Sequence, residues 1–202
     1  MAKIFITGGI SSGKSSFAEE TALSLYKSAI AAGGRQVPSE KSRASLHFIA
    51  TAGLGGENEY EDAEMDLKIE RHKERRDRAF TVHENFAELQ AEIDGICKSL
   101  SSEPGMKSGA ILIDSMTLWL ASIFKDVSGY NAALESVIKF SELISKLECS
   151  VLTVADSLGF NMVPVDAYAR KFIELNGLME QELSAVSDKA YCVIAGNPVA
   201  LK

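Results

Sequence analysis

The chain has 202 residues, of which 46% are hydrophobic, and this size and composition suit one globular domain with a substantial core. Its 28 acidic residues outnumber its 21 basic ones, and the net charge of −7 argues against broad binding to nucleic acid or to an anionic membrane surface. Any anion-binding site must therefore be formed locally, by a few residues.

The cysteines and the apolar runs bear on the compartment of the protein. Cys97, Cys149 and Cys192 are widely spaced and form no C-x-x-C or zinc-ligand pattern, so we interpret them as reduced, buried or half-buried thiols. The apolar start of the chain is only a few residues long, and no apolar run of about 18 residues follows. We expect a cytoplasmic protein without a signal peptide or a membrane-spanning helix.

The first predicted elements are a buried strand at residues 3–6 and a helix from Ser16 to Ala32, with a glycine-rich turn between them. The turn reads Gly8-Gly9-Ile10-Ser11-Ser12-Gly13-Lys14-Ser15 and matches the phosphate-binding pattern G-x-x-x-x-G-K-[ST]. Glycines let backbone N–H groups surround an anion, and the following helix directs its positive dipole end at it. Lys14 would add a positive charge, and the Ser15 hydroxyl would bind the Mg²⁺ of a nucleoside triphosphate.

The rest of the chain alternates short β-rich runs with helix-length segments. We predict strands at residues 46–50, 110–113, 150–154 and 190–194, and an extended surface connection at residues 33–43. This alternation indicates a P-loop NTPase-like α/β fold, a mainly parallel sheet with helices on both faces, in a single domain over residues 1–202. A further loop at residues 51–58 is rich in glycine; it is either a ligand-binding loop at a strand's carboxyl end or a plain connector.

A charged helix is predicted at residues 59–78. Residues three and four apart share a helix face, so Lys68, Arg75 and Arg76 lie beside His72 and would surround it with positive charge. This setting favours neutral imidazole, a nucleophile able to attack phosphorus. The alternative is a solvated surface helix with many ion pairs and an incidental histidine.

Nearly the whole chain resembles one family, the bifunctional adenosylcobinamide kinase/adenosylcobinamide-phosphate guanylyltransferases of cobalamin biosynthesis. The segments that carry the resemblance are residues 5–15, 48–52, 62–73 and 114–120, together with the closing region from Val163-Pro164 to Leu201-Lys202. The helix with His72 and the run from Asp114 to Leu120 are much more specific to the family than the phosphate loop.

The resemblance implies two reactions. A nucleoside triphosphate, ATP or GTP, would phosphorylate the terminal hydroxyl of the aminopropanol arm of adenosylcobinamide, and GMP from GTP would then be transferred to that phosphate. The second step is similar to covalent catalysis through a guanylylated histidine, and the matching position is His72. The family also suggests a homo-oligomer, a trimer in which a neighbouring subunit completes a site for the corrinoid.

Residue roles follow from the same resemblance. Lys14 and the backbone of residues 8–15 would hold the phosphates, and Ser15 and Asp114 would hold Mg²⁺ directly or through water. The alternative for Asp114 is the cap of a helix that begins near Thr117. The guanine nucleotide would lie against these residues: Ala50, Thr51, Ala52, Lys73, Glu74, Arg75, Arg76 and Glu84. Glu84 could instead be an exposed acid near a helix start, Trp119 and Leu120 are expected in the core, and His47 and His83 are given structural or surface roles.

Three positions depart from the family pattern. Ser11 stands where the family commonly carries a basic residue, Asp156-Ser157 stands where it has an Asn-Glu pair, and Glu180 replaces an Asn before Gln181. These polar changes bear on the kinase half of the chemistry. Two other readings stay open: a divergent P-loop kinase or single-activity nucleotidyltransferase with another small substrate, and a non-catalytic nucleotide-binding protein.

Overall fold

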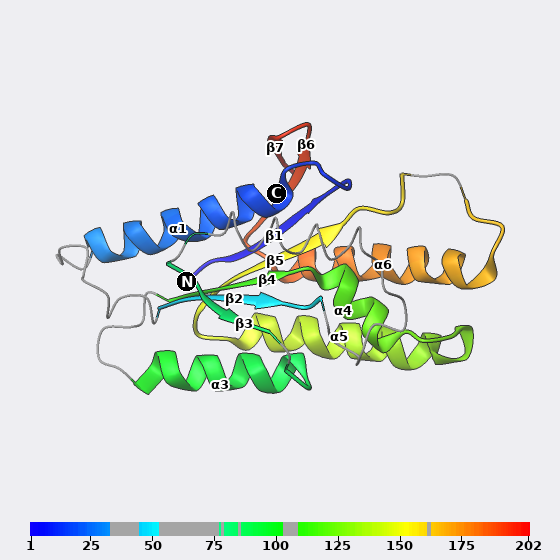
Figure 1. Ribbon diagram of the computed structural model, residues 1–202, viewed down its shortest axis with the longest axis horizontal. Helices are drawn as coiled ribbons and strands as arrows, with labels where there is room; N and C mark the ends of the chain where they lie inside the picture. Colours follow the sequence, from blue (N-terminus) through cyan, green and yellow to red (C-terminus); the bar gives the residue numbers. More distant parts are fainter. Residues whose placement is uncertain (33–44, 53–76, 78, 85, 103–108, 161–162) are drawn as a thin grey trace.

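The computed structural model describes residues 1–32, 45–52, 77, 79–84, 86–102, 109–160 and 163–202. In these residues seven strands form one sheet in the order β3-β2-β4-β5-β1-β6-β7 (Figure 1). All neighbouring strands are parallel except β6 and β7, which form an antiparallel hairpin. The strands are β1 (Lys3–Gly8), β2 (Leu46–Ala50), β3 (Thr81–His83), β4 (Ala110–Asp114), β5 (Ser150–Asp156), β6 (Lys189–Ile194) and β7 (Asn197–Ala200).

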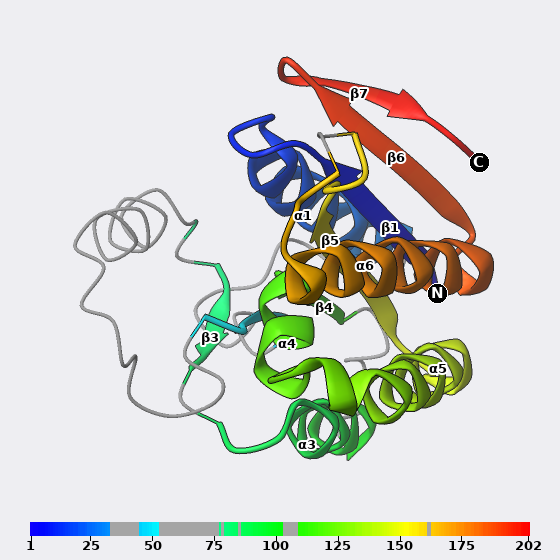
Figure 2. The ribbon, with the colours of Figure 1, turned by 90° about the vertical axis from the view of Figure 1, so that its right-hand side faces the viewer.

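Helices cover both faces of this sheet, as Figure 2 shows. The first helix, α1 (Lys14–Ala32), packs on one face of the strands. Four helices pack on the other face: α3 (Leu89–Ser102), α4 (Met116–Ile123), α5 (Tyr130–Lys146) and α6 (Ala167–Val186), with a short 3-10 turn, η2 (Val127–Gly129), before α5. The predicted fold class, a mainly parallel sheet between helices, is therefore confirmed.

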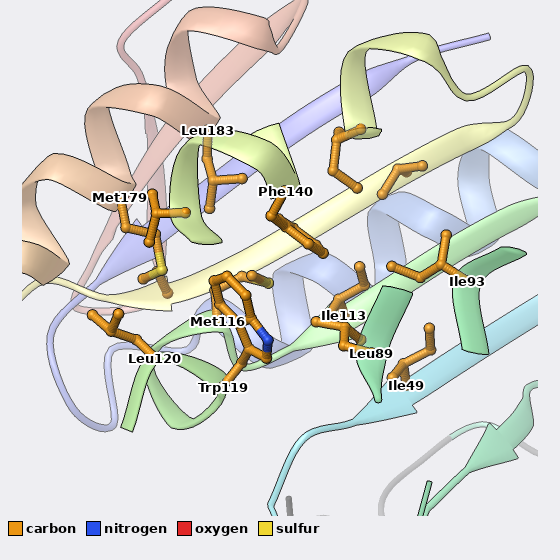
Figure 3. Close-up of a cluster of buried hydrophobic side chains, with 14 of the residues drawn as sticks. Ile49, Leu89, Ile93, Ile113, Met116, Trp119, Leu120, Phe140, Met179 and Leu183 are labelled. Atoms are coloured by element: carbon orange, nitrogen blue, oxygen red, sulfur yellow. The ribbon is translucent and has the colours of Figure 1, made fainter. Parts of the chain in front are cut away.

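The core explains why the buried strands read as nearly continuous apolar runs. All six residues of β1 are buried, because helices pack on both of its faces. On the four-helix side, Trp119 of α4 packs against Phe140 of α5 with ring centroids 4.9 Å apart (Figure 3). Trp119 is 6% exposed and Leu120 is fully buried, which confirms their prediction as core residues.

The parallel arrangement determines where a ligand can bind. The carboxyl ends of parallel strands lie along one edge of the sheet, so the segments that follow β1, β2, β4 and β5 meet there. This edge carries the phosphate loop after β1, Thr51 after β2, and the terminal residues Asp114 and Asp156 of β4 and β5. Among the described residues, no helix combines the length and the apolar character that crossing a membrane requires.

Candidate active site

The phosphate loop joins the end of β1 to the start of α1. The backbone N–H of Ser12 donates to the carbonyl of Gly9 at 3.1 Å, and that of Phe17 donates to the carbonyl of Gly13 at 3.0 Å. Gly13 has φ +95°, a left-handed conformation that L side chains rarely adopt, and Ser11 has φ +58°. The sequence pattern thus folds locally into a turn that precedes the positive end of α1, a suitable place for phosphate.

Lys14, the first residue of α1, turns back over this loop. Its Nζ donates to the carbonyl of Gly9 at 3.3 Å and lies 2.6 Å from Oδ1 of Asp156, at the end of β5. Only 8% of Lys14 is exposed, so the ion pair is largely shielded from solvent. The cation that would bind phosphate is therefore paired with a carboxylate in this structure.

Asp114 ends β4, and the helix α4 begins two residues later, at Met116. The Ser115 side chain accepts a hydrogen bond from the backbone N–H of Leu118 and caps α4. The helix-cap alternative for Asp114 is therefore wrong, because its neighbour fills that position. Asp114 lies two strands from β1, across β5, at the same edge of the sheet as the phosphate loop.

Thr51 ties the end of β2 to the end of β4. Its hydroxyl donates to the carbonyl of Ser115 at 2.6 Å and accepts from the N–H of Ser115 at 2.9 Å, while its own N–H donates to the carbonyl of Asp114 at 3.2 Å. Thr51 is 1% exposed. Its hydroxyl and N–H are both bonded to the backbone of Asp114 and Ser115. If Thr51 contacts the nucleotide directly, its carbonyl group would make that contact.

The remaining nucleotide-binding candidates among the described residues lie further along the edge. Ala50 and Ala52 flank Thr51 at the end of β2, and Glu84 follows β3, the edge strand. With neighbouring strands ~4.8 Å apart, β2 lies about 14 Å and β3 about 19 Å from β1. The predicted site residues thus form two groups along one edge of the sheet. One group contains the phosphate loop and Asp114, and the other contains residues 50–52 and Glu84.

His72, Lys73, Glu74, Arg75 and Arg76 lie outside the described residues, as do Lys68 and the glycines at 53, 55 and 56. Their predicted roles stay predictions.

Two polar networks near this edge were missed by the sequence analysis. In the first, Nδ1 of His83 lies 2.5 Å from Oε1 of Glu92, and Nε2 of His83 lies 2.9 Å from Nδ1 of His47. The three residues come from β3, α3 and β2, so no spacing in the sequence links them. Their contact ties the end of β3, just before Glu84, to its neighbours. The structural or surface roles expected for the two histidines stay predictions.

The second network surrounds Asp156. Its N–H donates to the Thr117 hydroxyl at 2.8 Å, its carbonyl accepts from Nδ2 of Asn176 at 2.8 Å, and Thr117 donates to Oδ1 of Asn176 at 3.1 Å. Nearby, the Thr7 hydroxyl donates to Oε1 of Glu180. Burial of the Glu180 carboxyl raises its pKa above the ordinary value; the hydrogen bond from Thr7 opposes this shift, and the negative charge of Asp156 adds to it.

The donor set fits a magnesium ion carried by a nucleotide. The Ser15 hydroxyl and the Asp114 carboxylate supply oxygen, the ligand type that Mg²⁺ prefers. The described part of the chain contains no cluster of three or more His, Cys, Asp or Glu side chains that could hold a metal. Two protein ligands, completed by phosphate oxygens and water, suit Mg²⁺ better than an all-protein cage would.

The site combines a glycine loop after a buried strand, a helix that begins at that loop, and acidic residues at the ends of neighbouring parallel strands on the same edge of the sheet. These features define a P-loop nucleotide-binding protein. The chain belongs to the cobinamide kinase / cobinamide phosphate guanyltransferase family, whose model matches residues 4–201. The resemblance noted in the sequence is thereby confirmed, and with it the class of the protein as an enzyme that transfers phosphoryl and nucleotidyl groups.

Curated relatives match nearly end to end at low identity. The bifunctional adenosylcobalamin biosynthesis protein CobP of Pseudomonas aeruginosa is 25% identical over 199 residues, which cover 98% of this chain and 95% of that protein. The corresponding CobU of Salmonella typhimurium is 27% identical over 211 residues, covering 98% and 99%. That of Escherichia coli is 23% identical over 214 residues, with the same coverage.

Among solved structures, the KaiC-like protein PH0186 of Pyrococcus horikoshii OT3 aligns with 95% of this chain and 70% of its own, with a TM-score of 0.44 and 11% identity.

Proposed function

We propose that this protein phosphorylates adenosylcobinamide with a nucleoside triphosphate and then transfers GMP from GTP to the new phosphate, giving adenosylcobinamide-GDP and pyrophosphate. The observation that carries the proposal is the phosphate loop with Lys14 at the carboxyl edge of the sheet, in a chain that the family model matches over residues 4–201. ATP, GTP and the corrinoid are the substrates. Residues 1–202 would form one nucleotide-binding domain.

In the kinase step, the backbone of residues 8–15 would hold the triphosphate, and Lys14 would leave Asp156 to neutralise charge on the β- and γ-phosphates. Ser15 and Asp114 would hold Mg²⁺ directly or through water; when bound, the ion neutralises negative charge on the phosphates. The corrinoid hydroxyl forms a bond to the γ-phosphorus while the bond from that phosphorus to the bridging oxygen breaks, and a nucleoside diphosphate leaves.

In the second step, an imidazole nitrogen of His72 would attack the α-phosphorus of GTP, and pyrophosphate would leave. A phosphate oxygen of adenosylcobinamide phosphate then attacks the same phosphorus and releases His72. Residues 50–52 and 73–76 and Glu84 would bind the guanine nucleotide. Glu84 suits this role in type, because a carboxylate accepts hydrogen bonds from ribose hydroxyls or guanine N–H groups.

The deciding experiment uses the three histidines of the chain. The protein is incubated with Mg²⁺ and GTP carrying ³²P at the α-phosphate, then denatured, and acid-labile, base-stable label is measured. We expect label in the wild type, in His47→Gln and in His83→Gln, and none in His72→Ala. The variants His47→Gln and His83→Gln control for the loss of an imidazole elsewhere in the protein. Both of these histidines lie in the network with Glu92.

Each other outcome has a defined meaning. Label that needs His47 or His83 would move the nucleophile to that residue. Absence of label while GTP binds would contradict the histidine mechanism and favour a divergent P-loop kinase, or a nucleotide-binding protein if no substrate is turned over. Unlabelled protein that nevertheless phosphorylates adenosylcobinamide would retain only the kinase half.

The assembly and compartment belong to the same proposal. A cobinamide is far larger than a nucleotide, so a cleft between subunits of a homo-oligomer, a trimer, would suit it. We place the enzyme in the cytoplasm. Its net charge of −7 is in keeping with a protein that binds neither nucleic acid nor a membrane surface. Light scattering on the purified protein tests the oligomeric state.

A further inference from the structure

Cys97 and Cys149 are far apart in the chain and in contact in the fold. Their Sγ atoms are 3.4 Å apart and share a hydrogen bond, although 52 residues separate them. Cys97 lies on α3, and Cys149 lies in the turn between α5 and β5. Neither residue takes part in the proposed transfer reactions, so the two thiols form a chemically reactive pair outside the nucleotide site.

The two thiols differ in their access to solvent. Both pack in the apolar core on the four-helix side of the sheet. Cys149 is 5% exposed, whereas Cys97 is only half-buried. A small reagent can therefore approach the pair from the side of Cys97.

A buried ammonium group lies beside the turn that carries Cys149. Nζ of Lys3 donates to the carbonyls of Leu147 at 2.8 Å and Cys149 at 2.7 Å, and Lys3 is 8% exposed. The hydrogen bond from Cys97 lowers the pKa of the Cys149 thiol; burial opposes this shift, and the charge of Lys3 adds to it. Cys149 is thus the sulfur suited to be a thiolate, and Cys97 the one that keeps a proton.

We propose that Cys97 and Cys149 form a site of reversible oxidation, at which hydrogen peroxide joins the two sulfurs in a disulfide. A thiolate next to a second thiol is the arrangement that redox-sensitive cysteines use. In the cytoplasm, where we place the enzyme, thiols are kept reduced, so the pair rests as two thiols and is cross-linked only while peroxide is present.

The reaction has two steps. The Cys149 thiolate attacks one oxygen of the peroxide and the O–O bond breaks, which leaves a sulfenic acid and a hydroxide that takes a proton from water. The Cys97 sulfur then attacks the Cys149 sulfur; the S–S bond forms, the S–O bond breaks, and hydroxide leaves with the Cys97 proton as water. In sum, two thiols lose two electrons to one peroxide, and two water molecules form.

The geometry permits this bond between Cys97 and Cys149 and not with the third cysteine. A disulfide bond is about 2.05 Å long, so the two sulfurs must approach by about 1.4 Å, which small side-chain rotations can supply. Cys192 lies on β6, two strands from β5, and is level with Ala155 in the strand register. It is therefore about 20 Å along the strands from Cys149 and serves as an internal control.

The disulfide would stabilise the fold and leave the nucleotide site unchanged. It closes a long segment of chain, which restricts the unfolded state, and it ties α3 to β5 in the sheet. Cys149 lies at the amino end of β5, about 23 Å from Asp156 at the carboxyl end, where the phosphate loop lies. The cross-link therefore does not reach the edge that binds phosphate.

The test treats the reduced, full-length protein with excess hydrogen peroxide and then blocks free thiols with N-ethylmaleimide. Mass spectrometry of non-reduced peptides should find Cys97 linked to Cys149, and dithiothreitol should remove the link. The Tm of the oxidised protein should be higher by about 4 °C or more. The Kd for Mg-ATP should change by less than about twofold.

The matched control is Cys192→Ser, which should show the same link and the same rise in Tm. Cys97→Ser keeps the thiolate and removes its partner, so peroxide should carry Cys149 on to the sulfinic acid instead of a disulfide. The wild type and Cys192→Ser decide the question even where a core variant does not fold.

Three outcomes would overturn parts of the proposal. Oxidation of Cys192 while Cys97 and Cys149 stay unlinked would refute the site, and so would a link that includes Cys192. A link without a rise in Tm would refute the stabilising role. Loss of Mg-ATP binding in the linked protein, restored by dithiothreitol, would refute the claim that the nucleotide site is spared. None of these readouts depends on the corrinoid chemistry, so a failure of the proposed function leaves the test intact.

Discussion

The backbone N–H of Gly196 donates a hydrogen bond of 2.8 Å to the carbonyl of Ser12, so the turn of the C-terminal hairpin touches the phosphate loop. A Cβ on Gly13 would come within 3.3 Å of the Gly196 Cα, and one on Gly8 within 2.6 Å of the Val193 carbonyl oxygen. The shape of the loop is therefore supported by β6 and β7 as well as by its own glycines.

The first prediction compares the two glycines that open the loop. In Gly8→Ala the new methyl group would lie 2.6 Å from a backbone oxygen of β6 and from the Ser12 Oγ, and β6 cannot move aside without breaking its pairing with β1. We expect the ligand-free protein to lose about 2–3 kcal/mol of stability. Gly9→Ala, with no atom within 4 Å of its Cβ, should stay within about 0.5 kcal/mol of the wild type.

Urea unfolding followed by circular dichroism measures both variants. Equal stabilities would show that the loop adapts to the methyl group and that the contact with β6 does not constrain it.

The second prediction stabilises the hairpin that supports the loop. Ala195 and Gly196 join β6 to β7 with φ +49° and +79°, the pattern of a type I′ turn. Alanine is strained in this left-handed conformation, whereas Asn adopts it readily. We expect Ala195→Asn to raise the free energy of unfolding by about 0.5–1 kcal/mol. Ala200→Asn, on the exposed strand β7, controls for the change in polarity, and a gain of equal size there would contradict the turn explanation.

Local patterns predicted the parts of the fold that are local. The apolar runs of β1, β2, β4, β5 and β6 were predicted within a few residues, because most residues of the first four strands are buried and β6 buries Ala190 and Val193. Strand β3 was missed because it has only three residues, two of them exposed, and β7 because all of its residues are exposed and one is Pro198.

The candidate site likewise has one part that a local sequence pattern predicts and one part that it does not. The phosphate loop is continuous in sequence, so its pattern is visible there, as is Asp114 at a strand end. The contacts around Asp156 join β5 to Thr117 and Asn176, which lie 39 and 20 residues away in the chain. These three residues lie on separate elements, β5, α4 and α6, so only the fold shows that they bond one another.

The third prediction concerns the histidine network and guanine nucleotide. The Glu92 carboxylate accepts a hydrogen bond from Nδ1 of His83, whose Nε2 contacts His47, and Glu84 follows directly. Glu92→Ala would leave a partly buried imidazole without its acceptor and loosen β3. We expect the Kd for GTP to rise about fivefold, equivalent to about 1 kcal/mol, with kcat for the kinase step unchanged.

The control for this effect is Glu88→Ala, an exposed acid just before α3 that removes the same charge. Isothermal titration calorimetry with GTP measures both variants. Equal GTP affinity in Glu92→Ala and the wild type would show that the network stabilises the fold without positioning Glu84.

The fourth prediction uses the paired thiols. The Sγ atoms of Cys97 and Cys149 are 3.4 Å apart, and this hydrogen bond, followed by burial, raises the pKa of the Cys97 thiol. Since only the thiolate is nucleophilic, iodoacetamide at pH 8 should modify Cys97 more than tenfold more slowly in the folded protein than in urea. Cys149→Ala removes the hydrogen bond and should speed the reaction, as read by mass spectrometry of the peptide. The same rate in that variant would assign the protection to burial alone.

The fifth prediction concerns Glu180 and pH. Burial raises the pKa of its carboxyl in the folded chain, so between the unfolded and the folded pKa the folded protein binds more protons than the unfolded chain does. The free energy of unfolding must therefore fall as pH rises through that window. Below it both states are protonated, and above it the loss is constant. Glu180→Gln should remove this loss while keeping an acceptor for Thr7.

We expect Glu180→Gln to be more stable than the wild type at pH 8, and the difference to shrink to nothing as pH falls below about 4.3, the ordinary pKa of glutamate. Thermal unfolding across this range measures it, and Glu148→Gln, at an exposed position after α5, controls for the loss of one negative charge. A gain that stays constant down to acid pH would arise from packing rather than from ionisation. A loss of stability at pH 8 would mean that the ionised Glu180 stabilises the end of β1 through its hydrogen bond from Thr7, and that this bond outweighs the cost of burying the charge.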